Sequence, residues 1–115
     1  MTQTTSMKFH IKIDSKHYHL DVPTLFLTEN EQFFRRMDKD MDQGWQMGKE
    51  WVDSPNTEQR CQIAASKLMS ALDTDKKPMA LLMAAYILSR MPSVNSVDID
   101  TTGEMQETHF MSAEN

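Results

Sequence analysis

"KFHIKIDSKHYHLDV" (Lys8–Val22) alternates apolar and polar residues on either side of a polar Asp-Ser-Lys segment, which is the pattern of two half-buried β-strands. We predict a hairpin with a tight turn at Ser15-Lys16. In this register the apolar face holds the pairs Phe9–Val22, Ile11–Leu20 and Ile13–Tyr18, and the polar face holds His10–Asp21, Lys12–His19 and Asp14–His17. Because a slip of one residue would turn every side chain to the wrong face, this hairpin is the best-specified local element.

A long helix is expected to follow the hairpin, after Pro23 ends the second strand. Thr28 and Glu31 form a capping-box pattern, and apolar residues then recur at helical spacing towards Val52. Gly44 and Gly48 fall on the apolar stripe of this predicted helix, next to Trp45. Glycine in a helix interior costs about 1 kcal/mol relative to alanine, so we expect these glycines to allow close helix packing. The alternative is that the helix ends near Gly48, which would then be a C-terminal cap.

Two more helices are predicted, over about residues 56–72 and 78–91. The first buries mainly small residues, among them Ala64 and Ala65. We expect this small-residue face to pack closely against the face of the long helix that carries Gly44 and Gly48. The second is apolar on nearly every side, so it must be buried on most of its surface. After Pro92, the sequence reads as two short strands joined by a Thr-Thr-Gly-Glu turn.

The element order ββαααββ predicts an α+β fold. We expect a small antiparallel sheet, built from the two terminal hairpins, with three helices packed on one side of it. The length of 115 residues fits a single domain, assigned to residues 7–111, with disordered termini at 1–6 and 112–115.

Composition and charge restrict the class of protein. The net charge is −5, and there is no lysine or arginine after Arg90, so a nucleic-acid-binding role is disfavoured. One cysteine cannot form an internal disulfide, which fits a reducing compartment. The longest apolar stretch, residues 78–88, is far shorter than the roughly 20 residues that span a bilayer. With no recognisable secretory signal, a cytoplasmic location without membrane contact is expected.

The sequence "DIDTTG" (Asp98–Gly103) is the sharpest local match to a known motif. It resembles the Asp-x-Asp-x-Thr signature of haloacid dehalogenase-type phosphatases, a likeness that implies a nucleophilic Asp98 and a proton-transferring Asp100. That family needs a doubly wound domain after the motif, and too little chain follows here. The stretch also resembles the start of an EF-hand calcium loop, but His109 stands where the twelfth-position glutamate should be. We therefore interpret it as a glycine turn that follows a strand.

The remaining candidates for chemistry are the histidines and the cysteine. His10, His17, His19 and His109 all fall on predicted strands, and we interpret the first three as part of a solvated sheet face. A transition-metal site and a surface for acidic ligands or RNA are the alternatives. Cys61 lies on an apolar helix face, where a thiol is inert. We predict no catalytic residue, no cofactor and no metal site.

Methionine is unusually frequent, at 11 of 115 residues. Met47, Met69 and Met79 fall off the apolar stripes of their helices, and methionine is over-used on surfaces that accommodate partners. The predicted partner-binding set is Met47, Met69, Met79, Leu82, Met83 and Tyr86. The favoured function is a non-catalytic interaction or assembly module that forms a homodimer or binds an unidentified protein.

Two other functions stay open at this point. One is a small-molecule-binding protein or enzyme with a pocket between helices and sheet, lined by Trp45, Trp51 and Tyr86. The other is a nucleic-acid accessory protein that uses the polar face of the first hairpin, with Lys8, Lys12, His17 and His19.

Overall fold

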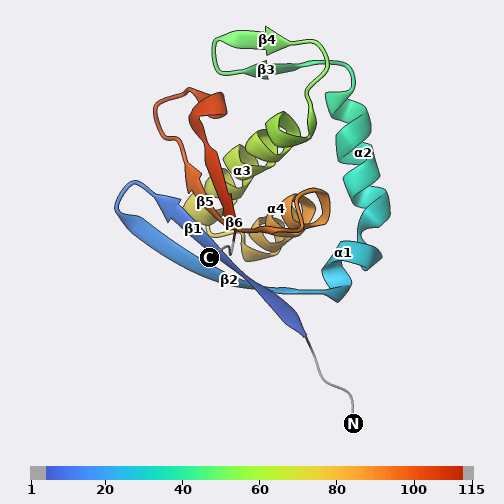
Figure 1. Ribbon diagram of the computed structural model, residues 1–115, viewed down its shortest axis with the longest axis vertical. Coiled ribbons are helices and arrows are strands. Elements are labelled where there is room, and N and C mark those ends of the chain that lie inside the picture. The colour runs from blue at the N-terminus through green and yellow to red at the C-terminus, as the bar shows by residue number, and fades with distance from the viewer. Residues whose placement is uncertain (1–4, 113–115) are drawn as a thin grey trace.

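The structure, a computed structural model, describes residues 5–112 and has an α+β fold (Figure 1). In chain order the elements are β1 (Ser6–Ile13), β2 (Lys16–Pro23), α1 (Leu25–Glu29), α2 (Glu31–Met41), β3 (Trp45–Met47), β4 (Glu50–Val52), α3 (Thr57–Asp73), α4 (Lys77–Arg90), β5 (Val94–Ile99), the short 3-10 helix η1 (Met105–Glu107) and β6 (His109–Ser112). The predicted disordered termini fall largely outside the described residues, although Ser6 and Ser112 belong to strands.

The main sheet has the strand order β2-β1-β5-β6. The two terminal hairpins form it, as expected, but the sheet is mixed rather than antiparallel because β1 and β5 run parallel. The alternation in each hairpin determines pairing within that hairpin and carries no information on how the two hairpins join. In Figure 1 the helices lie on one side of this sheet, and α4 lies between the sheet and α2.

The first hairpin forms with a different register from the predicted one. Its turn is Asp14-Ser15, and Asp14 adopts a left-handed φ of 56°. Phe9 therefore faces Leu20, and His10 faces His19. The shift moves each cross-strand partner by two residues, so every side chain keeps its predicted face while its neighbours change.

The prediction of one long helix that runs towards Val52 is wrong. The chain forms α1 and α2, leaves the helical conformation after Met41, and then forms the separate two-stranded hairpin β3–β4. Gly44 and Gly48 have φ values of +98° and +68°, which a helix interior does not contain. The predicted close helix packing through Gly44, Gly48 and Trp45 is therefore wrong as well.

The later helices form where the sequence predicts them. At the start of α3, Asn56 Oδ1 accepts a hydrogen bond from the Gln59 amide at 2.8 Å, and Gln59 Oε1 accepts one from the Asn56 amide at 2.9 Å. Pro78 lies in the first turn of α4, where its missing N–H costs nothing. No helix within residues 5–112 is long and apolar enough to cross a membrane.

The core lies between the inner face of the sheet and the helices α3 and α4, and it extends to the inner face of α2. Its largest fully buried side chains are Tyr86, Phe9, Phe34, Ile11, Met41, Ile63, Leu68, Met83, Ile87, Leu88, Val22 and Val97. On the far side of α4, the Phe34 ring of α2 meets the Tyr86 ring edge to face, with centroids 5.7 Å apart. As a result α4 is covered on both sides within one chain.

Candidate interaction surface

The β3–β4 hairpin lies at one end of the molecule (Figure 1). Trp51, on β4, is 55% exposed. Its ring lies so close to Gly44 that a Cβ atom at that position would overlap it. The indole Nε1 donates a hydrogen bond to Asp53 Oδ1 at 2.7 Å. The ring is thus held in place from two sides while more than half of its surface faces solvent.

The turn of this hairpin packs against the segment before β6. A Cβ atom at Gly48 would collide with the carbonyl oxygen of Gly103, so the two backbones can approach only because residue 48 is glycine. Nearby, Gln106 Nε2 donates to Glu50 Oε1 at 2.8 Å, and Gln106 Oε1 accepts from Gln59 Nε2 at 3.0 Å. The hairpin is therefore fixed to η1 and, through Gln106, to α3.

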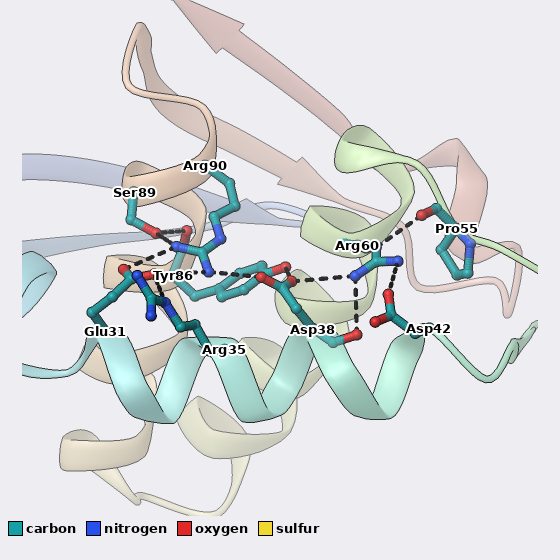
Figure 2. A network of polar contacts seen from close by, with 9 residues as sticks. All are labelled: Glu31, Arg35, Asp38, Asp42, Pro55, Arg60, Tyr86, Ser89 and Arg90. Atoms are coloured by element: carbon teal, nitrogen blue, oxygen red, sulfur yellow. Dashed lines mark hydrogen bonds and ion pairs between the residues drawn. The ribbon is translucent and has the colours of Figure 1, made fainter.

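The base of the hairpin is held by a single arginine of α3 (Figure 2). On the chain that enters the hairpin, Arg60 donates to the Asp38 carbonyl oxygen at 3.0 Å and to Asp42 Oδ1 at 2.6 Å. On the chain that leaves it, Arg60 Nε donates to the Pro55 carbonyl oxygen at 2.8 Å. One guanidinium group therefore ties both ends of segment 43–54 to α3.

Asp38 connects this arginine to α4 (Figure 2). It lies on the inner face of α2, four residues after the buried Phe34. Its carboxylate accepts hydrogen bonds from the Tyr86 hydroxyl and from Arg90 at 2.7 Å, and Arg60 lies 3.5 Å from it. Arg90 also pairs with Glu31 at 3.3 Å.

The pKa values of this network reflect burial and pairing together. Burial alone would raise the pKa of Asp38, but the hydrogen bonds from Tyr86 and Arg90 outweigh it, so the pKa lies below its ordinary value. Burial and the Asp38 carboxylate raise the pKa of Tyr86, which keeps the hydroxyl protonated. Because each guanidinium already faces carboxylates of its own chain, we interpret the network as a clamp that positions α2 and the hairpin.

The other residues that the sequence offered as candidates for chemistry have structural surroundings. Cys61 is fully buried, and this burial raises the pKa of its thiol to about 12, so it stays protonated at neutral pH. The Asp100 carboxylate accepts hydrogen bonds from the amides of Thr102 and Glu104, both at 2.9 Å, and thereby stabilises the turn after β5. Trp45, Trp51 and Tyr86 have separate surroundings: Lys67 Nζ lies 5.1 Å from the Trp45 ring centroid, Trp51 is exposed on the β3–β4 hairpin, and Tyr86 is buried beside Asp38.

The predicted partner-binding residues do not form one surface. Met47, Met83 and Tyr86 are buried, Met69 and Leu82 are half-buried, and Met79 is 39% exposed. Ala64 and Ala65 are fully buried on α3, which packs along α4. Most of the apolar surface of α4 on which the homodimer prediction rested is covered by α1, α2, α3 and the sheet, whereas Met79 stays exposed. Self-association itself stays a prediction.

The polar face of the first hairpin carries charges of both signs. Lys8 pairs with Asp21 at 3.2 Å, and Lys12 stands next to Asp98 of β5 in the sheet register. This face is not a continuous basic patch of the kind that phosphate backbones attract.

Sequence reasoning missed Asp38, Arg60 and Arg90, and it named Trp51 only as one residue lining a pocket between helices and sheet. The available signal was the position of Arg90 at the end of an otherwise largely apolar helix. Arg60 carried no such signal, because α3 also holds Lys67 and several polar side chains. No family model, no curated protein and no solved structure matches this chain. The fold and its surface thus describe a small α+β protein with a rigidly displayed tryptophan.

Proposed function

We propose that this protein is a non-catalytic binding module that contacts another protein through Trp51 and the β3–β4 hairpin. The observation that carries the proposal is the combination of fixation and exposure at Trp51: the ring is packed on Gly44 and bonded to Asp53, yet it is 55% exposed. Tryptophan is enriched among the residues that dominate binding energy, because a rigid ring buries a large area with little loss of conformational entropy.

The surroundings of Trp51 support a protein partner. The exposed residues of the hairpin next to it are polar or charged, namely Gln46, Lys49, Glu50 and Asp53. An apolar centre with a polar rim is the composition of a non-obligate protein interface. The non-catalytic part of the proposal is supported by the internal contacts that occupy Cys61, Asp100 and the two paired arginines.

The test is affinity capture from a native extract with three immobilised proteins: wild type, Trp51→Ala and Leu25→Ala. Leu25, on α1, is 63% exposed and is the matched control for the loss of an exposed apolar side chain elsewhere. We expect a protein that wild type and Leu25→Ala retain and that Trp51→Ala loses. Truncating such an anchor typically costs about 2 kcal/mol or more of binding free energy.

Two results would contradict the proposal. One is that no retained protein depends on Trp51, and the other is that Leu25→Ala loses the same proteins as Trp51→Ala. A second copy of this chain is tested separately by sedimentation of the purified wild type and Trp51→Ala. A dimer that Trp51→Ala abolishes would identify the partner as the protein itself.

A further inference from the structure

The outer face of the main sheet gathers all four histidines of the sequence. On this face His10 of β1 stands opposite His19 of β2, and His17 is two residues before His19 on the same strand. His109 of β6 lies at the other side of the sheet, beyond Lys12 and Asp98. The register of the first hairpin therefore makes three of the histidines neighbours and leaves the fourth apart.

The three neighbouring rings are in direct contact. His10 Nε2 and His17 Nδ1 are 2.8 Å apart and share a hydrogen bond. The His10 and His19 rings stack, with centroids 4.5 Å apart and planes 13° from parallel. His17 and His19 are exposed, so their rings can rotate without disturbing the core.

This arrangement lies close to the geometry of a metal site. With Zn–N bonds of 2.0–2.1 Å and tetrahedral angles, two ligand nitrogens are about 3.3 Å apart, so His10 and His17 need to separate by only about half an ångström. As the rings stand, no three histidine, cysteine or acidic side chains in residues 5–112 converge on one point. The exposed His19 ring, which stacks on His10, is the third imidazole of the cluster.

We propose that His10, His17 and His19 bind a late first-row divalent cation such as Zn²⁺ on the outer face of the sheet. Imidazole is a preferred ligand for these ions, and three imidazoles leave the fourth position for water. This site is separate from the Trp51 surface and does not depend on the proposed function.

Other charged side chains share the outer face of the sheet with the three histidines. The charged and titratable groups that share the outer face are Lys8, Lys12, Asp21, Asp98 and His109, and Asp21 already pairs with Lys8.

The experiment is calorimetric titration of untagged wild-type protein with Zn²⁺ at pH 7.5, repeated for His10→Asn, His17→Asn, His19→Asn and His109→Asn. We expect one ion per chain for wild type. Loss of even an outer partner of a metal ligand weakens affinity by about 10–100-fold, so each of the first three variants should bind at least about tenfold more weakly. His109→Asn, which removes a histidine from the same face but outside the cluster, should bind as wild type does.

Circular dichroism is used to check that each variant is folded. If His10→Asn is unstable, the variants at the exposed His17 and His19 still test the cluster. The proposal is overturned if wild type gives no saturable binding, or if His109→Asn weakens binding as much as His17→Asn. It is also overturned by one ion per two chains, because the ion would then bridge two molecules instead of occupying the three-histidine cluster.

Discussion

At the scale of single residues, Gly44 explains why Trp51 can lie where it does. A φ of +98° is unfavourable for any residue with a side chain, and the indole ring occupies the space that a Cβ would need. The sequence suggested that this glycine has a packing role, but it could not show that the partner is a tryptophan seven residues away. That contact depends on a turn whose backbone angles leave no signature in the hydrophobic periodicity.

Gly44→Ala should destabilise the protein more than Gly103→Ala does. Both glycines have left-handed φ values, +98° and +91°, but a Cβ at Gly103 has no atom within 4 Å. Gly103→Ala therefore measures backbone strain alone, and the additional overlap with Trp51 should cost Gly44→Ala about 1–3 kcal/mol more. Urea unfolding gives both free energies. Equal losses would mean that the Trp51 ring does not depend on Gly44.

At the scale of secondary-structure elements, α2 and the β3–β4 hairpin are positioned by polar contacts more than the other elements are. Phe34 and Met41 are the only fully buried residues of α2, and Asp38 between them binds Tyr86 and Arg90. Long-range ion pairs of this kind cannot be predicted from one sequence, because Asp38 lies 22 residues from Arg60 and 52 from Arg90. The first hairpin, α3 and α4 could be predicted because their alternation, capping and apolar patterns are local.

Asp38→Asn should lower the free energy of unfolding at neutral pH by about 1.5–3 kcal/mol, the range for hydrogen bonds to charged groups. Because the folded-state pKa of Asp38 lies below its ordinary 3.8, its contribution is complete above pH 4 and is lost as the pH falls through the folded-state pKa. The difference between wild type and Asp38→Asn should therefore shrink in acid.

Asp42→Asn is the matched control, because the Asp42 side chain also pairs with Arg60 but is 62% exposed. An exposed ion pair contributes only about 0–1 kcal/mol, so this variant should remain near wild type. Urea unfolding between pH 3 and 7 compares the three proteins. If Asp42→Asn costs as much as Asp38→Asn, the clamp would depend on Arg60 and Asp42 and not on Asp38.

At the scale of the whole molecule, α4 is enclosed between the sheet and α2, and this enclosure changes where a partner can bind. The sequence indicated correctly that such an apolar helix must be buried, but it could not show that α1 and α2 would cover it. The parallel pairing of β1 with β5 also could not be predicted from the sequence, because it joins segments more than 80 residues apart. The exposed apolar side chain that remains fixed in position is Trp51, on the separate hairpin.

The most direct test of this account is photo-crosslinking inside the native cell, with a photoreactive phenylalanine derivative placed at position 51 or, as the control, at position 25. Both positions are exposed, so the two variants differ in location and not in accessibility. The account predicts a discrete covalent adduct with another protein from position 51 and none from position 25. No adduct from position 51, or the same adducts from both positions, would contradict it.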